Sequence, residues 1–168
     1  INCFKKVLEI KPNYAEAYNN IGLVLQKKHK YNEAAENYRK AISIKSNFAT
    51  AYYNLGNVLK EQGKFEEAIA SFAKAIELKP DYAEAHNNLG KTLQGVDRHQ
   101  EAIESYNKAI ELKPNFTDAY LAVTSCLRSQ VPLWHVPMMN DAPRNMAYLE
   151  ALQATINENT QVLEIGTG

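Results

Sequence analysis

The chain has 168 residues, and nineteen Lys and Arg residues balance nineteen Asp and Glu residues, so its net charge is zero. This balance gives no global attraction to nucleic acid or to an anionic membrane, and we expect neither as a partner. No apolar run approaches the ~20 residues that a membrane-spanning helix needs. The first ten residues space their apolar side chains as on a helix face, which is unlike a signal peptide.

The chain contains two cysteines, Cys3 and Cys126, and both lie in segments with a helical pattern. Two cysteines without a disulfide framework favour a reducing compartment. We therefore expect buried thiols rather than a disulfide, and a cytoplasmic or nucleocytoplasmic location.

The first three quarters of the sequence repeat with a period of 34 residues. Ala49–Tyr82 and Ala83–Phe116 agree at 17 of 34 aligned positions. Small and large residues recur in phase: Gly22, Gly56 and Gly90; Ala34, Ala68 and Ala102; Ala41, Ala75 and Ala109; Tyr38, Phe72 and Tyr106. Spacings of three and four predict amphipathic helices, and small residues let two antiparallel helices approach closely. We therefore predict a stack of helix pairs.

The boundaries between helices are periodic as well. We predict first helices over about 14–27, 48–61 and 82–95, and second helices over about 31–44, 65–78 and 99–112. Each first helix follows Pro or Ser and then a capping candidate: Asn13, Asn47, Asp81 and, before the last segment, Asn115. Glu16 and Glu84, three residues further on, extend this to a capping-box pattern.

Each repeat has the same order of residue types: an aromatic residue or His (Tyr18, Tyr52, His86), a Leu/Ile–Gly pair, Ala, an aromatic residue, Ala and then Pro, with Ser46 in place of one Pro. This order resembles the tetratricopeptide repeat over Ile1–Ser129. The resemblance implies an all-α, right-handed superhelix. In it, residues 1–12 form the second helix of an earlier repeat and 13–116 form three repeats. Residues 117–129 form a capping helix, because Thr124 replaces the glycine and no second helix follows.

In such a superhelix the first helices line the concave face. We expect Glu16, Leu23, Gln26, Thr50, Lys60, Glu84 and Gln94 there, and we predict that a protein or peptide binds to Asn19, Asn20, Tyr53, Asn54, Asn57, Asn87, Asn88 and Lys91. Amides can bond the N–H and C=O groups of an extended peptide. The alternative is that Asn20, Asn54 and Asn88 satisfy neighbouring backbone groups within the solenoid, and both roles stay open.

The resemblance also bears on the type of ligand. The family includes asparagine ladders, for example in nucleocytoplasmic N-acetylglucosamine transferases, and carboxylate clamps for chaperone tails. Such clamps need Lys or Arg where this chain has Glu16, Thr50 and Glu84, which argues against a clamp. His29, His86 and His99 have no partner at metal-ligand spacing, so we expect surface or packing roles and no metal site.

The repeat pattern ends near Ser129. Residues 130–140 contain Pro132 and Pro137 and are predicted to form an extended linker. A helix is predicted to begin near Asp141, and Gln161–Ile165 has the composition of a short buried strand. The strand is followed by Gly166-Thr167-Gly168, which matches the first half of a nucleotide-cofactor loop.

Trp134–Gly168 resembles the start of a protein arginine methyltransferase, with His135, Met138, Arg144, Tyr148, Glu164, Gly166 and Gly168 at matching spacing. The resemblance makes residues 141–168 the truncated start of a domain that binds S-adenosylmethionine. It implies cofactor-binding roles for His135, Met138, Arg144, Glu164, Gly166 and Gly168. Arg144 would pair with the methionine carboxylate, and Met138 would pack near the methyl sulfonium.

Two departures from that family matter. Pro132-Leu133-Trp134 replaces the usual aromatic-rich element. The third glycine, the ribose-binding acid and the paired substrate-binding glutamates would all follow Gly168. We therefore expect no catalytic residue in these 168 residues, and no binding of S-adenosylmethionine to them alone.

Three functional readings remain open at this point. The first is a fragment of a repeat-bearing, S-adenosylmethionine-dependent protein arginine methyltransferase whose repeats recruit protein substrate. The second is a pure repeat scaffold or adaptor. The third is the repeat array of a different enzyme, such as a glycosyltransferase related to the O-linked N-acetylglucosamine transferases. Neither the oligomeric state nor the total number of repeats follows from the sequence.

Overall fold

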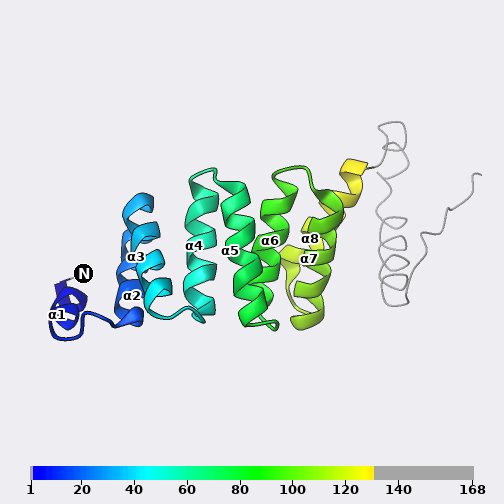
Figure 1. Cartoon of the computed structure of the whole chain (residues 1–168). Helices are drawn as coiled ribbons and strands as arrows, with labels where there is room; N and C mark the ends of the chain where they lie inside the picture. The colour runs from blue at the N-terminus through cyan, green and yellow to red at the C-terminus, as the bar shows by residue number, and fades with distance from the viewer. Residues whose placement is uncertain (1, 131–168) are drawn as a thin grey trace, which may run out of the picture. The chain divides into compact units, whose positions relative to one another are not determined.

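The computed structural model describes residues 2–130, which contain helices and no strand (Figure 1). Ile1–Arg128 form one compact unit. Its helices are α1 (Asn2–Ile10), α2 (Ala15–Lys27), α3 (Tyr31–Ile44), α4 (Ala49–Glu61), α5 (Phe65–Leu78), α6 (Ala83–Gln94), α7 (His99–Leu112) and α8 (Thr117–Gln130). Apart from Gln130, the predicted linker at 130–140 and the predicted helix and strand within 141–168 lie outside the described residues.

The periodicity predicts the helix ends closely. The second helices α3, α5 and α7 span the predicted residues. The first helices α2 and α4 begin one residue later than predicted, and α6 is one residue shorter at each end. The segment predicted as the second helix of an earlier repeat is α1, and the segment predicted as a capping helix is α8. The all-α prediction is therefore confirmed for the part of the chain that the structure describes.

Each helix pair is held by an aromatic ring that packs on a glycine. The rings of Tyr38, Phe72 and Tyr106 are fully buried. A methyl group added at Gly56 would lie 2.7 Å from the Phe72 ring, and one added at Gly22 would lie 2.6 Å from the Tyr38 ring. Such distances are shorter than any packed carbon contact, so these positions accept no side chain without movement of the ring or helix.

Neighbouring pairs share their core residues. Leu55, Leu59 and Phe72 belong to one buried cluster with residues of α2 and α3, and Leu93 and Tyr106 belong to another with residues of α8. Leu89 of α6 packs against both clusters. The apolar core therefore runs from pair to pair, as expected for a repeat array whose units cannot bury their apolar faces alone.

The predicted capping of the first helices is wrong. The residues that precede α2, α4 and α6 are aromatic (Tyr14, Phe48 and Tyr82), and none of them makes a side-chain cap hydrogen bond. The capping candidates Asn13, Asn47, Asp81 and Asn115 lie one residue earlier, inside a turn. The Tyr82 N–H donates to the Lys79 carbonyl at 3.2 Å, which makes Lys79–Tyr82 a β-turn with Pro80 at its second position.

The capping-box prediction fails as well, because the two glutamates bind lysines instead. Glu16 pairs with Lys45 at 3.0 Å and Glu84 pairs with Lys113 at 3.4 Å. The lysines begin the turns that lead to the next helices. The same lysines lie over the ring that ends each turn: Lys45 Nζ is 4.9 Å from the Phe48 ring centroid and Lys113 Nζ is 5.0 Å from that of Phe116.

The two cysteines form no disulfide, as predicted. Cys126 is buried, and burial raises the pKa of its thiol. The prediction that both thiols are buried is wrong for Cys3, which is exposed on α1. Among residues 2–130, every helix is too short or too polar to cross a membrane.

We predict that Gly56→Ala destabilises the array by about 1–3 kcal/mol, because the new methyl group overlaps the Phe72 ring. Urea unfolding followed by circular dichroism measures the change. The matched control is Gly95→Ala, since an added methyl group there has only ordinary contacts of 3.4–3.5 Å with backbone oxygens. Equal unfolding midpoints for Gly56→Ala and wild type would show that the ring does not need the glycine.

Candidate peptide-binding face

The predicted ligand-binding residues belong to neighbouring first helices. Helix α2 contacts α4, and α4 contacts α6. We use "helix-A face" for the surface formed by the residues predicted to lie on the concave side of these helices. The predicted ligand contacts within it are Asn19, Asn20, Tyr53, Asn54, Asn57, Asn87, Asn88 and Lys91. The asparagines among these contacts form two groups that differ in their hydrogen bonds. Asn19, Asn54 and Asn87 are buried, and Asn20, Asn57 and Asn88 are half-buried.

The buried group joins adjacent first helices. Asn19 and Asn54 are 5% and 6% exposed. The Asn54 Nδ2 donates to the Asn19 Oδ1 at 3.0 Å across a separation of 35 residues. An unpaired amide at this depth would cost about 1–3 kcal/mol, so this bond fixes how α2 and α4 sit against each other.

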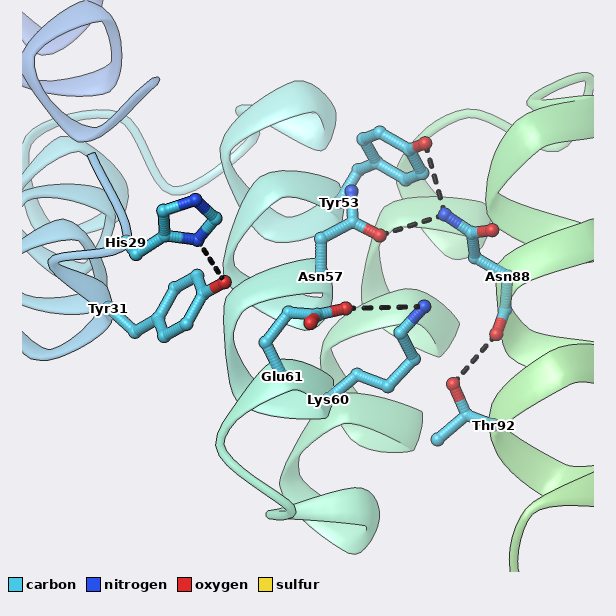
Figure 2. Close-up of polar contacts among 8 residues, drawn as sticks. All are labelled: His29, Tyr31, Tyr53, Asn57, Lys60, Glu61, Asn88 and Thr92. Carbon is cyan, nitrogen blue, oxygen red and sulfur yellow. Dashed lines mark hydrogen bonds and ion pairs between the residues drawn. The ribbon is translucent and has the colours of Figure 1, made fainter. Parts of the chain in front are cut away.

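Helices α4 and α6 are joined at the same sequence separation as α2 and α4, but by a different donor and acceptor. Asn88 Nδ2 donates to the Tyr53 hydroxyl at 3.1 Å, again across 35 residues, and to the Asn57 Oδ1 at 2.8 Å. Figure 2 shows Tyr53 and Asn57 of α4 turned toward Asn88 of α6. Thr92 donates its hydroxyl to the Asn88 carbonyl at 2.7 Å within α6. These residues form a polar contact between α4 and α6 that was not predicted as a network.

Between α6 and α8 no hydrogen bond is possible between the side chains at the equivalent positions. Asn87 is 3% exposed, and the residue 35 positions further on is Ala122 of α8, which has no polar side chain. The Asn87 Oδ1 accordingly has no hydrogen-bond partner among the described residues. This atom is buried at an energetic cost, because a buried amide oxygen without a donor loses its hydration.

The half-buried group keeps bonding capacity that the described residues do not use. Asn57 uses its oxygen and Asn88 uses its nitrogen in their mutual bond. Within residues 2–130, the Asn57 Nδ2 and the Asn88 Oδ1 are not engaged by any other side chain or backbone group. One donor and one acceptor thus remain side by side, which matches the C=O and N–H groups of an extended peptide backbone. Asn20 is also half-buried, and Lys91 is exposed.

Two glutamines expected on this face are instead tied into the repeat core. The Tyr38 hydroxyl donates to Gln26 Oε1 at 2.8 Å, and the Tyr106 hydroxyl donates to Gln94 Oε1 at 2.8 Å. Burial raises the pKa of both tyrosines, so the hydroxyls stay protonated donors. In the middle repeat both partners differ, since Lys60 stands in place of the glutamine and Phe72 in place of the tyrosine.

The edge of the face carries ion pairs. Lys91 lies 3.4 Å from Asp118 of α8, and Glu16 and Glu84 pair with lysines of the turns. The hydrogen bond from Lys45 lowers the pKa of Glu16, with the positive charge acting in the same direction. In the middle repeat Thr50 holds the equivalent position and carries no charge.

A cavity of about 500 Å³ opens elsewhere, at the α1 end of the array. Its floor is apolar and its rim carries charges of both signs: Leu8, Tyr18, Ile21, Leu25, Lys28, Lys30, Glu33, Glu36 and Asn37 line it. None of the predicted ligand-binding residues belongs to this set. The predicted cofactor-binding residues His135, Met138, Arg144, Glu164, Gly166 and Gly168 lie outside the described residues.

The predicted packing and surface roles of the three array histidines fit their contacts. His29 Nδ1 shares a hydrogen bond of 2.9 Å with the Tyr31 hydroxyl (Figure 2). His86 Nε2 lies 3.1 Å from the Pro80 carbonyl oxygen, and His99 lies 3.7 Å from the Asp97 carboxylate. All three therefore contact residues close in sequence, in or beside the turns.

Comparison with family models places the repeats. The model described as "TPR repeat" matches residues 1–29, 27–63 and 56–96, and the model "Tetratricopeptide repeat" matches 83–116. Together these matches run from the first residue to the end of α7 and the turn after it.

Among solved structures, the crystal structure of MamA superimposes with a TM-score of 0.74 at 28% identity, covering 90% of this chain and 86% of that chain. The crystal structure of YrrB, described as a TPR protein with an unusual peptide-binding site, superimposes with a TM-score of 0.72 at 26% identity. It covers 90% of this chain and 75% of YrrB. The first TPR of Spaghetti (RPAP3), bound to the HSP90 peptide SRMEEVD, superimposes with a TM-score of 0.68 at 23% identity, covering 68% of this chain and 91% of that chain. At that identity, the likeness concerns the fold alone.

A curated relative extends the comparison to an enzyme. An arginine N(omega)-methyltransferase from Streptomyces achromogenes subsp. streptozoticus is 43% identical over 47 residues. The match covers 28% of this chain and 13% of the relative, so the chain spans a small part of that protein's length.

We predict that Ala122→Asn stabilises the array by about 0.5–1.5 kcal/mol, because the new amide can donate to the buried Asn87 Oδ1 as Asn54 donates to Asn19. Thermal unfolding measures the shift. The control is Ala122→Leu, which adds similar bulk without a donor and leaves the oxygen unpaired. An Asn variant no more stable than the Leu variant would contradict the register deduced from the other two repeats.

Proposed function

Because this chain belongs to the tetratricopeptide repeat family and forms a protein-interaction module, we propose that its helix-A face binds an extended peptide segment of a partner protein. The observation that carries this proposal is the half-buried pair of Asn57 and Asn88, with one amide donor and one amide acceptor left for a peptide backbone. The likeness to YrrB, which has a peptide-binding site, supports it.

We further propose that the array is the recruiting arm of an S-adenosylmethionine-dependent protein arginine methyltransferase. Two observations support this: the match to an arginine N(omega)-methyltransferase, and the spacing of His135, Met138, Arg144 and Gly166 after the repeats. In such an enzyme the repeats hold a substrate protein while a separate domain transfers the methyl group to an arginine. Contacts with the repeats that are equally strong in the ground state and the transition state lower KM without raising kcat.

The reading frame that contains this chain offers a first test. A methyltransferase continuation requires a glycine two positions after Gly168 and an acidic residue about 20 residues later. A frame that continues with further repeats supports a scaffold, and a glycosyltransferase domain supports the third reading. The 168 residues alone are expected to show no binding of S-adenosylmethionine in calorimetry.

For the whole protein, we predict that Asn57→Ala raises the KM for a protein substrate about three- to tenfold and leaves kcat unchanged, because it removes uniform binding. The kinetics with a short arginine peptide that cannot reach the repeats should not change. Asn37→Ala is the matched control, since Asn37 of α3 bonds only the Glu33 carbonyl, at 2.8 Å. Loss of kcat in Asn57→Ala, or an equal effect on the short peptide, would contradict a recruiting role.

A further inference from the structure

The middle repeat differs from its neighbours at positions where the neighbours agree. Within the helices, repeats one and three carry the same residue at five such positions, and the middle repeat departs at each: Glu16, Thr50 and Glu84; Asn19, Tyr53 and Asn87; Gln26, Lys60 and Gln94; Glu36, Ala70 and Glu104; Tyr38, Phe72 and Tyr106. Three of these five positions belong to the first helix. The change is therefore concentrated on α4, in the centre of the helix-A face.

The substitution of Gln by Lys at position 60 is coupled to that of Tyr by Phe at position 72. Gln26 and Gln94 are held by tyrosine hydroxyls at 2.8 Å. Phe72 is fully buried and has no hydroxyl, so it cannot donate a hydrogen bond to the residue at position 60. Lys60 lies on the same face of α4 as Asn57, one turn further along (Figure 2).

The second change removes a negative charge from the same helix. Thr50 replaces the glutamate that pairs with the turn lysine in the outer repeats. The equivalent lysine of the middle repeat, Lys79, lies 4.7 Å from the Tyr82 ring centroid and has no carboxylate in its own repeat at that position. At these two positions α4 therefore carries a hydroxyl and an ammonium group, where α2 and α6 carry a carboxylate and an amide.

The spacing of the repeats indicates which residue of α6 is the neighbour of Lys60. Gln94 Nε2 lies 3.4 Å from Ser125 Oγ of the next first helix. The residues at the equivalent positions one repeat earlier are Lys60 and Lys91. Both lysines form long ion pairs. Lys60 Nζ lies 3.8 Å from Glu61 Oε1, and Lys91 Nζ lies 3.4 Å from Oδ2 of Asp118, whose side chain is 66% exposed. Exposed pairs of this kind contribute little and rearrange readily.

We propose that Lys60 and Lys91 bind an acidic side chain, an internal Asp or Glu of the partner peptide, while Asn57 and Asn88 bind the peptide backbone beside it. This rests on the proposed function, in which the helix-A face binds an extended peptide. The site differs from a clamp for a C-terminal carboxylate. The lysines stand toward the C-terminal ends of α4 and α6, whereas Glu16, Thr50 and Glu84 occupy the first turns.

The test is selection from a random peptide library, amidated at the C-terminus, on the full 168-residue chain. Wild type is expected to enrich peptides with Asp or Glu at one fixed position. Lys60→Gln, which installs the residue of the other two repeats, is expected to lose that preference and to bind the best wild-type peptide about fivefold more weakly. Replacing the acidic residue of the peptide by its amide should weaken wild type about equally and the variant hardly at all.

The control is Lys74→Gln on α5, which removes an exposed lysine that pairs with Glu77 at 2.6 Å away from the helix-A face. Enriched peptides without an acidic residue, or an acidic preference that Lys60→Gln leaves intact, overturn the proposed acidic site while peptide binding stands. Failure of wild type to enrich any peptide contradicts peptide binding itself, and the acidic site with it.

Discussion

The structure depends on the packing of one aromatic ring against one glycine in each repeat. The Tyr38, Phe72 and Tyr106 rings cover Gly22, Gly56 and Gly90 so closely that a methyl group has no room. This contact sets the distance between the two helices of a pair, and with it the position of every side chain on the first helix. Because the pairs share core residues such as Leu89, a fixed geometry within each pair is passed along the array.

That geometry determines which residues of neighbouring first helices lie opposite each other, and amide side chains form hydrogen bonds between them. Asn19 with Asn54 and Tyr53 with Asn88 bond across 35 residues in both cases. The buried bond is structural, whereas the second leaves Asn57 and Asn88 with bonding capacity at the surface. A structural role is thus seen for Asn54, and the peptide contact proposed for Asn57 and Asn88 falls on α4 and α6.

The sequence predicts the helices well because a 34-residue period fixes their ends repeatedly and independently. It predicts the caps wrongly, since Asn47 and Asp81 are equally suited to the turn that precedes the helix. The burial of Asn54 beside the half-burial of Asn57 could not be predicted, because it depends on contacts between helices that are distant in sequence. The substitutions at Lys60 and Phe72 can be seen in the sequence. That they remove a hydrogen bond follows only from the Gln–Tyr bonds that the structure shows in the other two repeats.

The central claim is that a peptide lies across α4 and α6 on the helix-A face. Hydrogen–deuterium exchange of the full chain, with and without a peptide selected on it, tests this most directly. A peptide bound there is expected to slow exchange in Ala49–Glu61 and Ala83–Gln94 and to leave α5 and α7 unchanged. Protection confined to α5 and α7, or to the cavity lined by α1, α2 and α3, would place the ligand elsewhere and contradict the account.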